Sequence, residues 1–308
     1  MATKILVTRR IHPEAISMLR GAGLEIKYFD VNQLLDQTIL LEIIPGFDAI
    51  LTCVTDKLHS DILTLAPKLR VISNMAAGLD NIDVRFAKSK GIQVFNTPDV
   101  VTASTADMTL TIAFALMRKI IASHTFVING EWKGWDPEIF LGRTFSALTW
   151  GIVGFGKIGK AVAKRLTGFE IPVLYFDPVE NSAIDNATKT DLSILLKKSD
   201  VVSLHIPLTQ QTHCFFDWEK FSLMKPSAYF INMARGGVIN QIHLVKALRE
   251  NIIAGAALDV FDPEPIPIDH EILTLNNVIF TPHIGTATQE CRREMAILAA
   301  KNIINYFK

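Results

Sequence analysis

Cysteine is scarce in this sequence, and its few cysteines are far apart. Among 308 residues there are only Cys53, Cys214 and Cys291, an odd number without C-x-x-C spacing. A secreted disulfide framework needs paired cysteines, and a thiolate metal site needs clustered ones. The sequence therefore indicates neither of these, predicts no metal site, and fits a reducing cytoplasm.

An excess of charge of one sign and long apolar runs are also missing. Thirty-one basic residues balance thirty-one acidic ones, and no run rich in lysine or arginine occurs, so nothing points to nucleic acid or anionic lipid as a partner. The apolar stretch 108–117 ends at Arg118 and Lys119, far short of a membrane span, and no cleavage site follows the N-terminal apolar run. We therefore expect a cytoplasmic protein whose partner is a small molecule or another protein.

What the sequence does contain is an apolar α/β pattern. Hydrophobic residues make up 49% of the chain and charged residues 20%, which is typical of a globular protein of one to three domains. Short apolar runs bounded by turn residues alternate with helix-length segments, and in the first of these segments Pro13 opens a helix that Gly21 and Gly23 close. This alternation predicts parallel βαβ units. The first series of expected strands comprises 4–8, 25–29, 47–53, 69–75 and 91–96.

The pattern changes near residues 96–98, which indicates a passage from one domain to another. Residues 103–127 contain neither proline nor glycine and predict one long helix. Beyond it, a second series of short apolar runs alternates with helix-length segments, which predicts a second α/β domain. Its expected strands are 148–154, 172–177, 200–207, 228–234, 255–261 and 277–283.

The last segment, 287–307, reads as an amphipathic helix that runs to the end of the chain. We expect this helix to return to the first domain. The predicted fold is therefore α/β with two doubly wound parallel-sheet domains. A Rossmann domain that binds NAD, residues 99–285, is inserted into a flavodoxin-like substrate domain formed by residues 1–98 and 286–308.

A glycine-rich loop, GFGKIG at 154–159, follows an expected strand and opens an expected helix. In this context Gly154 permits the tight turn, Gly156 lets the backbone approach a pyrophosphate, and Gly159 allows close packing of helix on strand. Asp177 ends the next expected strand, about twenty residues further on, where an acid that binds a ribose is expected. The three features together predict a dinucleotide site. Its loop also includes Phe155, Lys157 and Ile158.

Three ionisable residues follow later expected strands, where ligands of α/β proteins usually bind. They are Arg235 in INMARGG, Glu264 in LDVFDPEP and His283 in FTPHIGTAT. Taken singly, they read as a surface charge, a turn carboxylate and a residue at a helix start. Taken together, they form an anion clamp, an orienting carboxylate and an acid.

Seven segments carry a resemblance to a known family. They are NMAAGLDNID (74–83), NTPDVVTASTAD (96–107), WGIVGFGKIG (150–159), HIPLTQQT (205–212), INMARGGVIN (231–240), AALDVFDPEP (256–265) and TPHIGTAT (281–288). In this order they resemble the D-isomer-specific 2-hydroxyacid dehydrogenases, and within that family the glyoxylate and hydroxypyruvate reductases. The resemblance covers essentially the whole chain.

The resemblance implies an NAD-dependent oxidoreductase that acts on small 2-oxo and 2-hydroxy acids. Arg235 would grip the carboxylate and carbonyl of the 2-oxo acid through its planar fork. Hydride would pass from the nicotinamide to the carbonyl carbon, and His283 would protonate the developing alkoxide. Glu264 would hold the other imidazole nitrogen and favour the charged ring.

The resemblance also implies the binding residues. Backbone N–H groups of the loop Ala76, Ala77 and Gly78 would hold the substrate carboxylate, and the small side chains would leave room for a short acid. Asp259 would hold the nicotinamide carboxamide. The remaining cofactor residues that it implies are Thr105 near the phosphate, His205 and Pro207 at the adenine end, and Thr212, Ala234 and His283.

Two departures from the family pattern bear on these expectations. Asn240 and Gln241 replace an acidic pair, which puts local helix capping in question more than catalysis. Asp177 and Pro178 stand where reductases that prefer NADP often have serine and arginine. Because a carboxylate there faces the 2′-phosphate with a like charge, we expect NADH to be preferred over NADPH.

Two other functions stay open. The first is a dinucleotide sensor resembling the dehydrogenase-like corepressors, which the absence of a long disordered tail disfavours. The second is a phosphite-type dehydrogenase, resembled around 134–135 and 302–304, which is disfavoured because a lysine of those relatives is replaced by Ala77. We also expect a homodimer, because the apolar stretch 103–117 and the aromatic segment 132–140 resemble the crossover that relatives use to embrace a partner.

Overall fold

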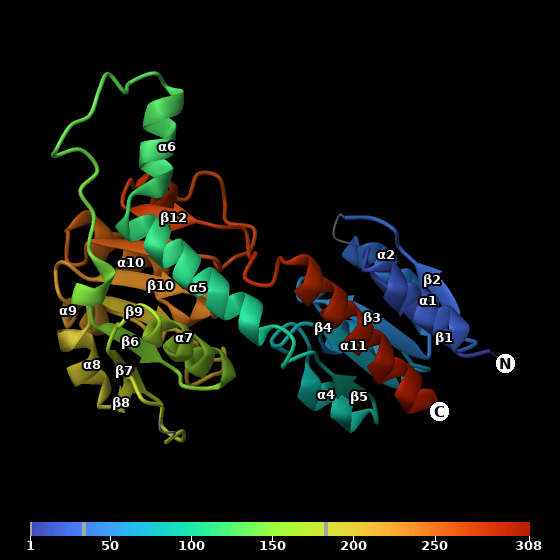
Figure 1. Ribbon diagram of the computed structural model, residues 1–308. Helices are drawn as coiled ribbons and strands as arrows, with labels where there is room; N and C mark the ends of the chain where they lie inside the picture. The colour runs from blue at the N-terminus through green and yellow to red at the C-terminus, as the bar shows by residue number, and fades with distance from the viewer. Residues whose placement is uncertain (1, 33–34, 182–183) are drawn as a thin grey trace. The chain divides into compact units, whose positions relative to one another are not determined.

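The chain forms two compact units. The computed structural model describes residues 2–32, 35–181 and 184–308 (Figure 1). The first unit extends to Val101 and takes up Thr286–Lys308 again, and the second unit is Thr102–Gly285. Each unit has its own parallel sheet with helices on both faces, so the predicted doubly wound α/β fold is confirmed.

The sheet of the first unit has the order β2-β1-β3-β4-β5, with all pairs parallel. Each strand coincides with one of the apolar runs expected from the sequence. The strands are β1 (Lys4–Val7), β2 (Glu25–Tyr28), β3 (Ala49–Cys53), β4 (Val71–Met75) and β5 (Gln93–Phe95).

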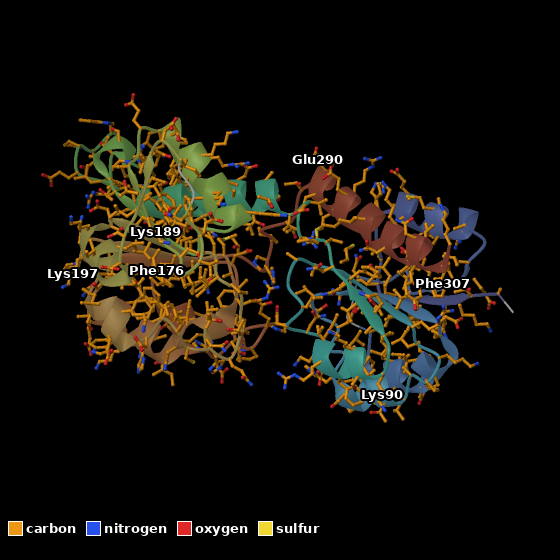
Figure 2. All side chains as sticks on the ribbon, turned by 90° about the horizontal axis from the view of Figure 1, so that it is seen from below. Lys90, Phe176, Lys189, Lys197, Glu290 and Phe307 are labelled. Atoms are coloured by element: carbon orange, nitrogen blue, oxygen red, sulfur yellow. The ribbon has the colours of Figure 1, made fainter. Side chains whose placement is uncertain are left out.

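Alternation along the strands divides the core of the first unit into two layers. In β1, Ile5 and Val7 pack with α1 (Pro13–Gly21) and α11 (Gln289–Phe307), whereas Leu6 packs on the opposite face. The helices on that opposite face are α2 (Gln37–Ile43), α3 (Ser60–Thr64) and α4 (Val84–Ser89). The last helix of the chain thus lies on the first sheet, and Figure 2 labels Glu290 and Phe307 near its two ends.

The sheet of the second unit has the order β12-β11-β10-β9-β6-β7-β8, again with all pairs parallel. Six of its strands were expected from apolar runs. The seventh, β8 (Ala187–Lys189), is a short edge strand without an apolar run, beside β7 (Figure 2). The others are β6 (Trp150–Val153), β7 (Val173–Phe176), β9 (Val201–Leu204), β10 (Tyr229–Asn232), β11 (Gly255–Leu258) and β12 (Val278–Phe280).

Helices cover both faces of this second sheet. One face packs against α5 (Thr102–Met117) and α7 (Lys157–Thr167). The other packs against α8 (Leu192–Lys198), α9 (Trp218–Ser222) and α10 (Gln241–Arg249). Short 3₁₀ turns occur at Ile44–Gly46, Phe145–Ala147, Gly236–Val238 and Glu271–Thr274. Because all the strands are parallel, the loops that follow them gather at one edge of the sheet.

The single helix expected over 103–127 is two helices, and that prediction was wrong. α5 ends at Met117, and α6 (Ile120–Ile128) begins after Lys119, whose φ of 52° is left-handed and breaks the helix. The two axes are bent by 59°. No single helix in the described ranges has the length and apolarity to cross a membrane. By length and composition alone, this bent pair passes the same test together.

Candidate active site

The loop between β6 and α7 leaves open space where a dinucleotide phosphate is expected. Gly154 has φ +93°, and a Cβ there would lie 2.6 Å from the carbonyl oxygen of His205. A Cβ on Gly159 would collide with the carbonyl oxygen of Gly154. At Gly156, by contrast, an added Cβ would meet nothing within 4 Å. The outer glycines are thus required by packing, and the middle one faces open space.

The same loop ends at a helix N-terminus that no side chain caps. Gly156 is the N-cap of α7 and has no side chain with which to accept the first-turn N–H groups. Such N–H groups, together with the helix dipole, favour an anion. The described residues therefore fit a bound pyrophosphate here.

Asp177 lies directly after β7, beside this loop. Its carboxylate accepts hydrogen bonds from the N–H of Phe155 at 2.8 Å and from those of Val179 and Glu180 at 2.9 Å each. Burial raises the pKa of Asp177, but the three N–H donors outweigh burial and leave the pKa below its usual value. A fixed, ionised carboxylate therefore stands at the end of this strand.

His205 follows β9 and carries no charge. Burial lowers the pKa of its imidazole to about 3. Nε2 lies 3.0 Å from Ser203 Oγ, which also accepts a hydrogen bond from the Trp150 indole at 2.9 Å. Nδ1 is buried and has no partner in the described chain. A neutral ring with one unsatisfied nitrogen is suited to a polar group of a ligand.

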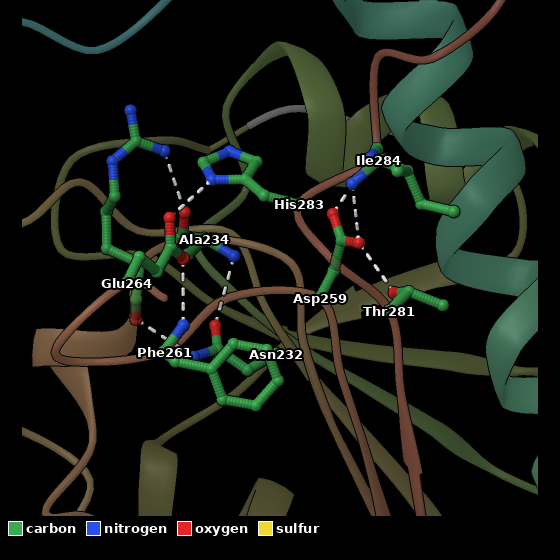
Figure 3. A network of polar contacts seen from close by, with 10 residues as sticks. Asn232, Ala234, Asp259, Phe261, Glu264, Thr281, His283 and Ile284 are labelled. Atoms are coloured by element: carbon green, nitrogen blue, oxygen red, sulfur yellow. Dashed lines mark hydrogen bonds and ion pairs between the residues drawn. The ribbon is translucent and has the colours of Figure 1, made fainter. Parts of the chain in front are cut away.

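His283 and Glu264 form a close pair (Figure 3). His283 Nδ1 lies 2.9 Å from Glu264 Oε2, and both side chains are 28% exposed. Burial raises the pKa of Glu264, but its hydrogen bond and charge interaction with His283, the Phe261 N–H and the charge of Arg235 outweigh it, so this pKa lies below the usual value. Glu264 is therefore an ionised carboxylate bound to one imidazole nitrogen. In the part of the chain that the structure describes, Nε2 of His283 has no partner.

The backbone around His283 is held by Asp259, which is 1% exposed. Its carboxylate accepts hydrogen bonds from Thr281 Oγ1 at 2.6 Å and from the N–H groups of Ile284 and Gly285 at 2.8 Å each (Figure 3). Its carbonyl accepts the N–H of His283, whose φ of 53° is left-handed. A left-handed conformation is unfavourable for histidine, so these bonds stabilise the turn that places the imidazole.

Arg235 follows β10 in a loop that packs against the loop carrying Glu264. A Cβ on Gly236 would overlap the backbone of Phe261, so the two loops need glycine at this contact. Asn232 holds the turn, because its amide donates to the carbonyl of Arg235 at 2.9 Å and accepts the N–H of Ala234 at 3.0 Å. The second unit thus brings Arg235, Glu264 and His283 to one edge of its sheet.

The loop Ala76–Gly78 follows β4 in the first unit. The N–H of Ala76 donates to the carbonyl of Asn74 at 2.8 Å, so it is not available to a substrate. The N–H groups of Ala77 and Gly78 donate no hydrogen bond within the described ranges. Buried Asn74 fixes the loop, because its amide donates to the carbonyl of Gly78 at 3.0 Å and to Asn81 at 2.9 Å.

The remaining expected cofactor residues lie in the second unit. Thr105 is buried in α5. In the loop after β9, Thr212 Oγ1 donates to the carbonyl of Pro207 at 2.5 Å, which closes a turn. The carbonyl of Ala234 accepts a hydrogen bond from Arg235 Nη1 at 2.8 Å. Asn240 does cap α10, because its side chain accepts the His243 N–H at 3.2 Å, so the loss of the acidic pair leaves this helix capped.

Sequence reasoning missed the residues that hold these loops in shape. Asn74 and Asn232 are both buried at the ends of strands. Each lies inside one of the seven motifs, as Thr281 does, and that position was the available signal. Each of the three fixes a loop through hydrogen bonds.

Comparison with known proteins decides the family. The family model "D-isomer specific 2-hydroxyacid dehydrogenase, NAD binding domain" matches residues 110–285. The chain therefore belongs to the D-isomer-specific 2-hydroxyacid dehydrogenase family. It is an oxidoreductase that acts on CH–OH groups, uses a nicotinamide dinucleotide and comes from a family that acts on small 2-oxo and 2-hydroxy acids.

Individual relatives agree over the full length. A glyoxylate reductase of Thermococcus litoralis is 42% identical over 320 aligned residues, covering 100% of this chain and 95% of that protein. The TT0316 protein of Thermus thermophilus has a TM-score of 0.93 at 37% identity and covers 99% of this chain and 98% of its own. An NADPH-dependent glyoxylate/hydroxypyruvate reductase of Sinorhizobium meliloti was solved with NADP and malonate. It has a TM-score of 0.89 at 27% identity, and the alignment covers 100% of this chain and 94% of that one.

Proposed function

We propose that this protein reduces a small 2-oxo acid, such as glyoxylate or hydroxypyruvate, with NADH as the preferred cofactor and His283 as the proton donor. The observation that carries the proposal is the His283–Glu264 pair, in which one imidazole nitrogen is bound by an ionised carboxylate and the other has no partner in the described chain. The 42% identical relative, named a glyoxylate reductase, supports this substrate class.

Each group has a defined task in this reaction. When bound, the reduced nicotinamide supplies the hydride. The Arg235 guanidinium binds the carboxylate and carbonyl of the 2-oxo acid, which turns the carbonyl carbon into a stronger electrophile. His283 Nε2 donates a proton to the carbonyl oxygen, and Glu264 stabilises the charged imidazole through Nδ1. In the first unit, the N–H groups of Ala77 and Gly78 are the ones we assign to the substrate carboxylate.

The residues that would hold the cofactor also follow from the observed contacts. The open space at Gly156 and the uncapped start of α7 would take the pyrophosphate, and Asp177 would take the ribose hydroxyls. The Asp259 carboxylate already accepts three hydrogen bonds from the turn around His283. Its Oδ2 accepts only the Gly285 N–H among the described contacts, so we assign this oxygen to the nicotinamide carboxamide. We also propose 1–98 with 286–308 as the substrate domain and 99–285 as the NAD-binding domain. Cytoplasmic location stays a prediction.

A spectrophotometric panel tests the proposal. We expect NADH oxidation with glyoxylate, hydroxypyruvate and pyruvate to exceed that with phenylpyruvate, because the site is proposed for a short acid and phenylpyruvate carries a bulky ring. The absorbance of NADH and of NADPH is followed with each of the four acids. A chain that turns over none of them contradicts the proposed function.

Changing Glu264 to glutamine is expected to lower kcat/KM for reduction by about tenfold at neutral pH. Reduction needs the proton that His283 donates, and the glutamine amide cannot offer this ring the negative charge that the carboxylate places 2.9 Å from Nδ1. In the wild type the low pKa of Glu264 keeps the pair intact as pH falls, until the carboxylate itself is protonated.

The measurement is kcat/KM from about pH 5 to about pH 10. Glu271→Gln is the matched control, since Glu271 pairs with Arg249 at the surface and is expected to leave the profile unchanged. A kcat/KM in Glu264→Gln within about twofold of the wild-type value throughout this range would contradict the role assigned to Glu264.

We also propose a homodimer, formed through α6 and the segment after it. The expected contribution of 103–117 was wrong, because the apolar side chains of α5 are buried in the core of their own unit. α6 has no buried residue in this structure, and Ile121 and Ile128 on it are 56% and 68% exposed. Trp132 and Trp135 in the following segment are 62% and 86% exposed. Figure 1 shows α6 and this segment standing away from the sheet of their own unit. Such a grouping of large apolar side chains is typical of a protein interface.

Sedimentation equilibrium at micromolar concentration is expected to give twice the chain mass of 34.2 kDa. Ile121→Glu with Ile128→Glu should shift the protein toward the monomer, because two carboxylates cannot be buried in an apolar contact without large cost. Ile268→Glu is the control, since Ile268 is a 93% exposed residue outside this group. A monomeric wild type overturns the proposal.

A further inference from the structure

The first unit contains an arginine pair in which only one member has an acidic partner. Arg10 Nε lies 2.5 Å from Asp30 Oδ1, and its Nη2 also donates to the Asp30 carbonyl at 3.0 Å. The neighbouring Arg9 forms no hydrogen bond or ion pair within the described residues. Its Nε is buried and has no partner there. A buried N–H without a partner is unfavourable, so the position of Arg9 calls for a ligand.

At the start of α11 lies a second arginine pair, Arg292 and Arg293, in which again only one member has an acidic partner. Arg293 donates from Nε to Glu14 Oε2 at 2.8 Å, and its Nη2 lies 2.7 Å from the same oxygen. Arg292 forms neither a hydrogen bond nor an ion pair through its side chain in the ranges that the structure covers. It is exposed to solvent, in the first turn of the helix.

Strand register places Arg9 at the carboxyl edge of the sheet. Val7 in β1 lies opposite Leu51 in β3, and the N–H of Thr8 continues the ladder to the Leu51 carbonyl at 3.2 Å. Arg9 follows two residues after the end of β1, at the same edge of the sheet as Cys53, the last residue of β3. Cys53 is paired in turn with Met75 in β4, which directly precedes Ala76.

Both unpartnered arginines act on the Cys53 thiol. Burial raises the pKa of this thiol to about 12 and Asp56 acts in the same direction, whereas the charges of Arg9 and Arg292 oppose the rise. Both guanidinium groups are thus close enough to Cys53 for their charges to act on its thiol. This agrees with the packing of Cys291, the residue before Arg292, in the same apolar cluster as Cys53.

The carboxylate nearest to these arginines is already engaged. Asp56 is buried, and its Oδ2 accepts hydrogen bonds from Thr8 at 2.6 Å, from Thr52 at 2.7 Å and from the N–H of Cys53 at 2.8 Å. It fixes the loop after β3, and no ion pair joins it to Arg9 among the described contacts. At this edge of the sheet, neither Arg9 nor Arg292 forms an ion pair with a described residue.

We propose that Arg9 and Arg292 bind one oxyanion, a carboxylate or a phosphate group, at this edge of the first unit, next to the loop that begins at Ala76. Guanidinium groups bind both anions through paired N–H donors. The anion is either the second acidic group of a longer 2-oxo acid or a free inorganic ion. The first source rests on the proposed function, whereas the site itself does not.

The binding test uses inorganic phosphate and needs no turnover. We expect sodium phosphate to raise the Tm of the wild type above its value in sodium chloride of equal ionic strength, because an anion bound only to the folded state stabilises it. Arg9→Met and Arg292→Met should lose this rise. Arg10→Met and Arg293→Met, the matched neighbours with acidic partners, should keep it.

Lysine variants of the two arginines serve as a second test of the site. If a methionine variant fails to fold, Arg9→Lys and Arg292→Lys retain the charge without the planar fork and are expected to show a smaller rise than the wild type. If the phosphate effect is the same in all variants, the two arginines do not form the site and the binding arm counts against the proposal.

The source of the anion is tested with matched substrates. Oxaloacetate and 2-oxoglutarate carry a second carboxylate, and 2-oxobutyrate and 2-oxovalerate do not. A loss of about tenfold or more in kcat/KM for the diacids alone in Arg9→Met identifies the second acidic group of a substrate. If Arg9→Met keeps the wild-type ratio of kcat/KM for diacids to that for monoacids, but loses the rise of Tm in phosphate, the bound group is a free anion. No change in either measurement overturns the proposal, and failure to reduce any 2-oxo acid contradicts only the proposed function.

Discussion

Replacing His283 is expected to lower kcat for glyoxylate reduction by about 10²- to 10⁴-fold, the usual contribution of a positioned general acid. The affinity for NADH should change little, because the glycine loop at 154–159 and Asp177 are untouched. The loss should appear in kcat more than in KM, since the proton is transferred in the transition state and the carboxylate clamp at Arg235 remains.

The choice of variant matters, because His283 has a left-handed backbone with φ 53°. Asparagine adopts this conformation more readily than alanine does, so His283→Asn removes the acid with less strain on the turn that Asp259 holds. Turnover is measured by NADH absorbance and binding by NADH fluorescence. His59→Ala, an exposed histidine in the first unit, is the control. A decrease of less than about tenfold in His283→Asn would contradict the role of proton donor.

Strands were predictable from this sequence wherever a run with apolar residues was bounded by turn residues, even where its residues are only half-buried or exposed, as in β2. Every strand of the first sheet and six of the second have such a run. β8 was missed because Ala187–Lys189 lies at the sheet edge, where the burial pattern is intermediate and exposed and no apolar run is required. Helix α1 was predictable from both ends, since Pro13 opens it and Gly23, with φ +77°, follows it.

The break between α5 and α6 was not predictable by the same rules. Lys119 is neither glycine nor proline, so nothing in its side chain signals a left-handed residue. Packing decides the outcome here: α5 is buried on several sides, with Ala106, Ala113 and Met117 fully covered, while α6 has no buried residue. Tertiary contacts thus end a helix that local propensity would continue.

Motifs located the residues of the candidate site better than they described their contacts. Arg235, Glu264 and His283 were found because each follows an apolar run, and parallel strands bring such loops to one edge. The hydrogen bonds of Asp259 to the turn at 284–285, and of Ala76 to Asn74, depend on loop conformation that no spacing rule specifies. Whether a backbone N–H is already hydrogen-bonded within its loop or is available to a ligand depends on that loop conformation.

NADH is expected to be preferred over NADPH by roughly a hundredfold or more in kcat/KM, because a like charge next to the 2′-phosphate costs several kcal/mol. The Asp177 carboxylate is ionised and is fixed by three backbone N–H groups, so it cannot turn away without breaking them. The nearby Lys160 offers little compensation, since its Nζ lies 2.7 Å from Glu180 Oε2. The NADPH-dependent relative from Sinorhizobium meliloti has the same fold, so the fold alone does not decide between the two cofactors.

Both cofactors are compared with glyoxylate and hydroxypyruvate in the wild type and in two variants. Asp177→Asn removes the charge and keeps one oxygen that can accept the backbone N–H groups, so the preference for NADH should shrink while the loop persists. Asp177→Ser with Pro178→Arg adds a cation for the phosphate and should shift the preference further, toward NADPH. Asp191→Asn, an exposed acid at the start of α8, is the control. Wild-type preference for NADPH, or an unchanged ratio in both variants, would mean that the Asp177 carboxylate does not face the ribose.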